Sequence, residues 1–96
     1  MDIGTVVTLV TAQGEIVGRL EAYDEHHITL SRPRISSELS IIDEAVAENF
    51  FASGISVTGE KCPESLSFSL SMVLAITVTE KSFAEKWAAT AHDWVI

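Results

Sequence analysis

Residues 14–30, GEIVGRLEAYDEHHITL, carry the pattern that most constrains the fold of this 96-residue chain. Apolar and polar residues alternate on both sides of residues 24–27, so the stretch predicts two β-strands joined by an acidic turn. Gly18 lies in the middle of the first strand, where a missing side chain allows a sharp bend or a close approach of another backbone. Glycine kinks of this kind let short strands curve into small barrels. The predicted apolar face is formed by Ile16, Leu20, Ala22, Ile28 and Leu30.

The strands next to this hairpin follow from composition and turn residues. Residues 5–11, TVVTLVT, are β-branched almost throughout and predict a first strand, with a short turn at residues 12–14 before the hairpin. The strand after the acidic turn is predicted to end by Arg32, because Pro33 has no N–H to donate to a sheet and favours a turn.

Residues 64–80 show the most regular pattern in the chain, with apolar residues at every second position. Strict alternation predicts a β-strand, but strands usually contain about five or six residues. We therefore expect this segment to bend midway and form a pair of strands. On its opposite face, serines give way to Val73 and Ala75, which predicts that the second half is buried on both sides.

Two helices are predicted outside the strands. Ser40 begins a capping-box pattern followed by apolar residues at helical spacing up to Phe50; a long β-hairpin through Ile55 and Val57 is the alternative. The second helix is predicted at residues 82–94, with Ser82 as its N-terminal cap. Its apolar face would contain Phe83, Trp87, Ala91 and Trp94.

Composition and charge limit the class of protein. The length predicts a single domain, residues 1–96, and 47% apolar residues suggest that part of the surface is hidden in an oligomer. The formal net charge of −8 argues against a general affinity for nucleic acid or anionic membranes. A single cysteine, Cys62, excludes an internal disulfide. No signal peptide or membrane-spanning run is recognised, so we expect a soluble cytoplasmic protein.

The acidic hairpin resembles the first signature motif of the Sm-like (LSm and Hfq-type) proteins. The spacing from Asp24 to Leu30 is most similar to the bacterial Hfq branch, and the whole chain looks most like divergent Sm-like proteins of marine phages. Residues 3–32 would then hold the strands of the first signature, residues 34–64 a variable insertion, and residues 64–80 the second signature. The matching positions of the first motif are Gly14, Ile16, Gly18, Leu20, Tyr23, Asp24, Ile28 and Leu30.

The resemblance implies a mainly β protein: a small, strongly bent, five-stranded antiparallel SH3-like barrel with one or two added helices. Family members close into homo-oligomeric rings when the edge strands of neighbouring subunits pair, which here implies a ring of five to seven copies. The usual N-terminal helix has no counterpart, and the added helix lies at the C-terminus instead.

The resemblance also implies binding of short single-stranded RNA near the pore. His26 stands where a base would stack, beside His27, and Asp24 would order the turn; Arg32 or Arg34 would contact phosphate. Two residue patterns differ from the family, because its turn asparagine is absent and Val73 and Leu74 replace a polar or charged pair. The residues alone equally allow solvated turn histidines and arginines that pair with acidic neighbours.

No catalytic residues, metal ligands or cofactor-binding motif are predicted, so an enzyme is not expected. Two functions therefore remain open. The first is an RNA-binding ring, and the second is a ring-shaped structural or protein-interaction module, which a phage could encode, without RNA binding. The acidic charge and the apolar Val73–Leu74 pair favour the second.

Overall fold

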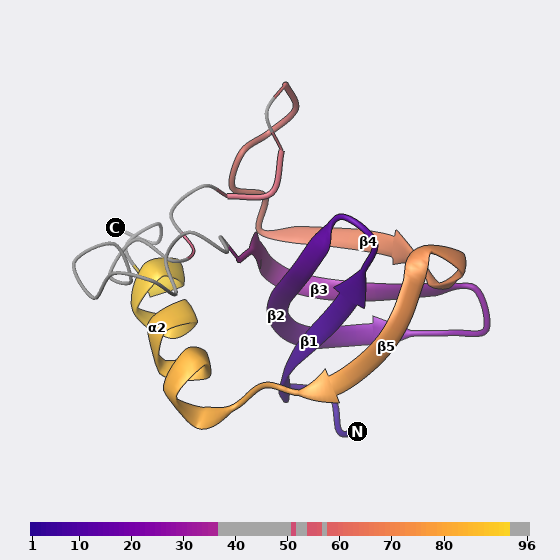
Figure 1. Ribbon diagram of the computed structural model, residues 1–96, viewed down its shortest axis with the longest axis horizontal. Coiled ribbons are helices and arrows are strands. Elements are labelled where there is room, and N and C mark those ends of the chain that lie inside the picture. The colour runs from indigo at the N-terminus through magenta and orange to yellow at the C-terminus, as the bar shows by residue number, and fades with distance from the viewer. Residues whose placement is uncertain (37–50, 52–53, 57, 93–96) are drawn as a thin grey trace.

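The computed structural model describes residues 1–36, 51, 54–56 and 58–92. These residues form a curved five-stranded antiparallel sheet in the order β4-β3-β2-β1-β5, followed by helix α2 (Figure 1). A one-turn 3₁₀ helix, η2 (Leu70–Met72), joins β4 to β5, so residues 64–80 form the bent strand pair expected from their length. The elements are β1 Val6–Thr11, β2 Gly14–Tyr23, β3 His27–Ile35, β4 Ser65–Ser69, β5 Val73–Val78 and α2 Lys81–His92.

A β-bulge in β3 corrects one prediction. Arg32 and Pro33 together lie opposite the single residue Gly18 of β2, where the register of the two strands shifts. Arg32 has a φ of 48°, in the left-handed region. The bulge takes Pro33 out of the hydrogen-bonded ladder, so its missing N–H breaks no strand pairing. The prediction that this strand ends by Arg32 is therefore wrong, and β3 continues to Ile35.

A second bulge lies in β2, at Glu21. Leu20 pairs with Leu30 and Ala22 pairs with Thr29, which leaves Glu21 as an extra residue without an opposite partner. Bulges increase the local twist and bend of a strand. With one bulge in each of two neighbouring strands, the sheet curls strongly, as Figure 1 shows.

The main core lies on the inner side of this curved sheet, and α2 covers part of the outer side. The predicted apolar face of the hairpin is buried there except for Ala22, which is exposed after the bulge. On the other face, Val17 packs with Phe51 and with Trp87 of α2. The buried residues of the main core are Val7, Leu9, Ile16, Leu20, Ile28 and Leu30.

Strand β5 differs from the prediction that it is buried on both sides. Leu74 is 74% exposed and Val78 is 58% exposed, while Val73 and Ile76 pack only partly against the core. Leu74 is the extra residue of a third irregularity, where the register between β1 and β5 shifts. The chain by itself thus leaves much of the apolar surface of β5 in contact with solvent.

The predicted helices have different outcomes. The helix proposed from Ser40 to Phe50 lies outside the described residues, as does Trp94. Helix α2 begins at Lys81, one residue before Ser82, so Ser82 is not its cap. Instead, the Glu80 carbonyl accepts the first backbone hydrogen bonds, and the Ser82 hydroxyl donates to the Glu80 carboxylate at 3.2 Å. None of the helices described is long and apolar enough to cross a membrane.

Candidate functional site

The turn between β2 and β3 is ordered by Asp24. One oxygen of its carboxylate, Oδ1, accepts hydrogen bonds from the backbone N–H groups of His26 and His27, at 2.7 and 2.8 Å. The backbone N–H of Asp24 in turn donates to the His27 carbonyl at 2.9 Å. Aspartate is favoured in turns because its side chain satisfies backbone donors in this way. The prediction that Asp24 organises its own turn is confirmed.

The same turn contacts the connection between β4 and β5. The backbone N–H of Leu70, the first residue of η2, donates to the His26 carbonyl at 2.8 Å. The His26 backbone is therefore held from two directions, while the side chains of His26 and His27 remain exposed. His27 Nδ1 lies 3.9 Å from Asp24 Oδ1, a loose contact between solvent-exposed groups. Two exposed imidazoles thus stand on a fixed backbone at one end of the sheet.

The Asp24 carboxylate should hold this turn in place well into acid. The hydrogen bonds from the backbone of His26 and His27 lower its pKa below the usual 3.8. A carboxyl whose pKa is lowered by folding stabilises the folded state above its unfolded value, and this contribution disappears as the pH falls through the lowered value. We expect the amide NMR signals of His26 and His27 to show an acid transition with a midpoint below 3.8. A transition at or above that value, or one that persists in Asp24→Ala, would contradict this assignment.

The two predicted arginines do not lie beside the histidine turn. Arg32 lies five residues further along β3 than His27, about 17 Å at about 3.3 Å per residue. Arg34 is 0% exposed, and desolvation lowers its pKa to about 10, which leaves the side chain charged at neutral pH. In this chain, Arg34 is therefore an interior residue. Arg32 contributes to a second site at the opposite end of β3.

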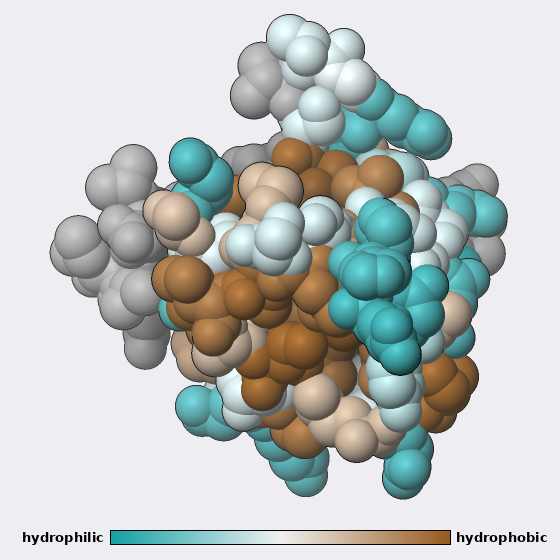
Figure 2. Space-filling view, turned by 90° about the vertical axis from the view of Figure 1, so that its right-hand side faces the viewer, coloured by the Kyte–Doolittle hydropathy of each residue, from teal (hydrophilic) through white to brown (hydrophobic). Residues whose placement is uncertain are grey.

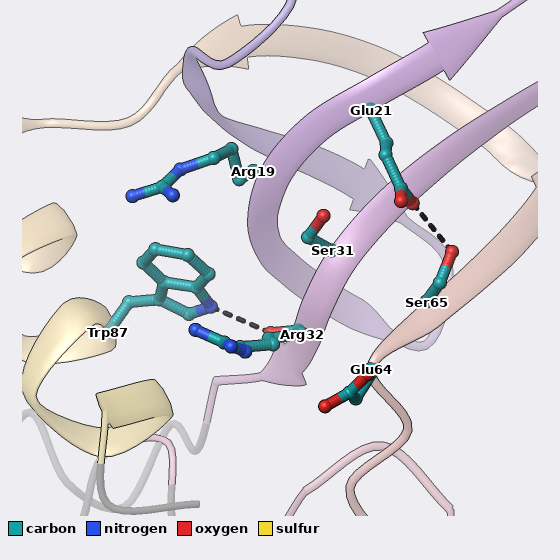
Figure 3. A pocket seen from close by; sticks show the side chains of 7 residues that line it. All are labelled: Arg19, Glu21, Ser31, Arg32, Glu64, Ser65 and Trp87. Carbon is teal, nitrogen blue, oxygen red and sulfur yellow. Dashed lines mark hydrogen bonds between the residues drawn. The ribbon is translucent and has the colours of Figure 1, made fainter. Parts of the chain in front are cut away.

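This second site is a pocket of about 260 Å³ between the outer face of β2 and β3, the start of β4, and α2 (Figure 3). Arg19 and Arg32 lie on either side of Trp87, and the acidic residues lie toward the β4 side (Figure 3). No pattern in the sequence predicted this pocket. It is lined by Arg19, Glu21, Ser31, Arg32, Glu64, Ser65 and Trp87.

The two bulges of the sheet place charged residues in the pocket. Glu21 and Arg32 are both bulge residues, and bulges redirect side chains relative to a regular strand. The backbone of Arg32 is fixed on both sides, because its N–H donates to the Glu64 carbonyl at 2.7 Å and its carbonyl accepts from Trp87 Nε1 at 2.9 Å. Pro33, a proline inside a strand pattern, was the one sequence signal for this bulge.

Trp87 is the structural centre of the pocket rather than an exposed stacking surface. Its side chain is 2% exposed, and Arg19 Cζ lies 5.7 Å from its ring centroid, within cation–π range. Trp87, which the sequence places on the apolar face of the predicted C-terminal helix, is buried in a cluster with Val17 and Phe51. Through one ring it fixes the side chain of Arg19 and the backbone of Arg32.

Comparison with known proteins adds no assignment to either site. No protein-family model and no curated protein matches this sequence. Within the residues described, no group of three histidine, cysteine, aspartate or glutamate side chains is placed to hold a metal ion. The turn, the pocket and the sheet edges are therefore the features from which a function can be inferred.

Proposed function

We propose that this chain is the subunit of an Sm-like homo-oligomeric ring, and that the ring binds short single-stranded RNA at the turn of residues 24–27. The strand order supports the first part, because β4 and β5 are the two edges of one strongly curved sheet. Strands β1 to β4 pair with their neighbours in sequence, and β5 returns to pair with β1, as in a small barrel built around the glycine-kinked hairpin. The fold alone does not fix a function, so the RNA-binding part rests on the turn itself.

The two edge strands, β4 and β5, support assembly into an oligomer. Among the described residues, no strand pairs with the outer edge of β4 or of β5. An edge of unpaired N–H and C=O groups is a template for another strand, and pairing β4 of one copy with β5 of the next makes a head-to-tail contact. Such a contact closes into a ring when the rotation per subunit allows it. Five to seven copies are the proposed range.

The surface of this part of the molecule agrees with burial in an assembly. Figure 2 shows an apolar area in the middle of the face that bears β5, next to hydrophilic residues. The large exposed apolar side chains of β5 and η2 are Met72, Leu74 and Val78. Contiguous apolar surface of this kind is typical of interaction sites.

The single observation that supports RNA binding is the fixed backbone of His26 beneath an exposed imidazole. Two hydrogen bonds hold the backbone of His26 in place: its N–H donates to the Asp24 carboxylate, and its carbonyl accepts from the N–H of Leu70 in η2. A ring would repeat this imidazole once per subunit around one opening. Imidazole rings can stack on unpaired bases, and when protonated they also attract phosphate.

The experiment that tests this proposal is native mass spectrometry with short oligo-U and oligo-A at two salt concentrations. We expect a closed oligomer that binds RNA, and less of it at the higher salt concentration, because phosphate contacts release counterions. A monomer would contradict the ring. A closed oligomer without RNA would contradict the RNA site and leave the protein-interaction ring.

His26→Ala is expected to weaken RNA binding by about tenfold, because each stacked base contributes about 1–3 kcal/mol. The measurement is the dissociation constant of fluorescent oligo-U. His27→Ala is the matched control, since neighbouring side chains at the start of a strand point in opposite directions. Equal losses in both variants would show that the histidines act through charge and not through stacking at His26.

The protein-interaction ring remains the second candidate, and two observations favour it. The chain has a net charge of −8, and the residues exposed on η2 and β5 include the large apolar side chains of Met72 and Leu74. An acidic ring with an apolar face suits a protein partner better than a polyanion.

A further inference from the structure

The pocket around Trp87 holds unpaired charges of both signs. Arg19 and Arg32 lie on its Trp87 side, whereas Glu21 and Glu64 lie on its β4 side (Figure 3). Within the described part of the chain, none of these four side chains forms an ion pair. In a small protein with only six basic residues, two arginines that face one pocket and remain without a carboxylate partner call for an explanation.

Two of these side chains, and the backbone of Arg32, are also held in place. Arg19 is fixed above the Trp87 ring, and the backbone of Arg32 is fixed by the Trp87 indole and the Glu64 carbonyl. On the acidic side, the Ser65 hydroxyl donates to Glu21 Oε2 at 2.6 Å. A site whose side chains are already positioned loses less entropy when a ligand binds.

We propose that this pocket binds a small zwitterion, a molecule that carries one carboxylate and one ammonium group. The carboxylate pairs with the guanidinium groups of Arg19 and Arg32 at the Trp87 side of the pocket, because the planar guanidinium group matches the geometry of a carboxylate. The ammonium group lies toward Glu21 and Glu64, which accept its hydrogen bonds. Ser31, between the two charged sides, offers a hydroxyl to either group (Figure 3).

The charge of the protein selects the zwitterion over a simple anion. A chain of net charge −8 repels an anion at long range, and Glu21 and Glu64 repel it again inside the pocket. A simple cation is repelled inside the pocket by the two arginines. A zwitterion has no net charge, so it avoids the long-range repulsion and pairs with both sides of the pocket at short range.

The size of the pocket limits the ligand further. A volume of about 260 Å³ lies below the range of about 300–1,000 Å³ that is typical of drug-sized ligands. The ligand is thus an amino acid or an ω-amino acid with a short carbon chain. Because Arg19, Glu21 and Glu64 are exposed, water screens their charges, and the expected dissociation constant lies in the millimolar range.

The test is an NMR titration of the full-length protein that follows the indole N–H signal of Trp87. Trp94→Phe identifies this signal, because the chain has two tryptophans. The probes are glycine, β-alanine, 4-aminobutyrate and 6-aminohexanoate, with butyrate and butylamine as ligands that carry one charge each. We expect saturable shifts with at least one amino acid and at least tenfold weaker binding of butyrate and butylamine, since each charged hydrogen bond lost costs about tenfold or more.

Three outcomes would overturn the proposal. If butyrate binds as well as 4-aminobutyrate, the pocket is an anion site. If butylamine binds as well as 4-aminobutyrate, it is a cation site. The absence of a saturable shift with every amino acid would mean that it binds none of them. The proposal is independent of RNA binding, because the signal reports on Trp87 and not on the histidine turn.

Charge variants assign the binding to the two sides of the pocket. Arg32→Gln, Arg19→Gln and Glu21→Gln should each weaken the best amino acid about tenfold. Lys81→Gln and Glu60→Gln are matched controls, because they make the same changes in net charge at exposed positions outside the pocket lining. Controls that weaken binding equally would show that net charge, and not the pocket, governs the shift.

Discussion

Gly18→Val is expected to lower the free energy of unfolding by about 3 kcal/mol, the upper end of the usual cost of overpacking a core. A Cβ atom at position 18 would lie 2.9 Å from Leu30 Cβ and 3.1 Å from the Ser31 carbonyl oxygen. Neither atom is the end of a flexible side chain, so the two strands would have to separate. Chemical denaturation at a fixed protein concentration measures the effect, since self-association also contributes to stability.

The size series and the control make this prediction specific. Gly18→Ala should cost about 1–2 kcal/mol, because it adds the first clashing atom without the branched methyl groups. Alanine also lowers the conformational entropy of the unfolded chain, which offsets part of this cost. Ala22→Val introduces the same residue at an exposed position of the same strand and should change stability by no more than about 0.5 kcal/mol. If Gly18→Val behaves like this control, the close approach of β2 and β3 does not constrain the fold.

The hairpin around Gly18 was predictable because its signals are local. Alternation gave the buried faces of Ile16, Leu20, Ile28 and Leu30, and the turn chemistry of Asp24 gave the hydrogen bonds that its carboxylate makes. In each case the pattern lies within one strand or one turn, so the sequence shows it directly.

The bulges and the pocket were not predictable for the opposite reason. Pro33 predicts the end of a strand, because a local rule cannot tell a strand end from a bulge that removes proline from the ladder. The pocket requires that bulge, the bulge at Glu21 and the contact of Trp87 with Arg32, 55 positions away in sequence. No local pattern contains this combination of residues.

The exposure of β5 has a different physical basis. Its composition suits a buried strand, yet Leu74 and Val78 are exposed in the single chain. The sequence pattern is typical of a strand that is covered on both faces, and among the described residues no second layer covers the exposed side chains of β5. A partner surface would explain why an apolar strand is exposed in the single copy. Substitutions at the free edge of β5 therefore test the proposed ring most directly.

Val78→Pro is expected to convert the proposed ring into monomers without unfolding the subunit. Thr79 N–H donates to the Val6 carbonyl, and in an antiparallel ladder neighbouring residues point their backbone groups to opposite sides. The N–H of Val78 therefore points away from β1, toward the free edge. Proline removes this donor and is tolerated at a sheet edge. Native mass spectrometry should show loss of the closed oligomer, with an unchanged far-ultraviolet circular dichroism spectrum of the monomer.

Val78→Thr is the matched control, because it keeps the edge N–H and a β-branched side chain while making position 78 more polar. It should retain the oligomer, whereas a monomeric Val78→Thr variant would show that apolar packing, and not strand pairing, holds the subunits together. Ser67→Pro tests the partner edge. The backbone N–H of Arg32 donates to Glu64 and that of Leu70 donates to His26, so the hydrogen-bonded pairs of β3 and β4 fall at the even-numbered positions 64 to 70. The backbone groups of Ser67 therefore point outward, away from β3. Head-to-tail pairing requires both proline variants to be monomeric; an oligomer that survives either one excludes that edge from the interface.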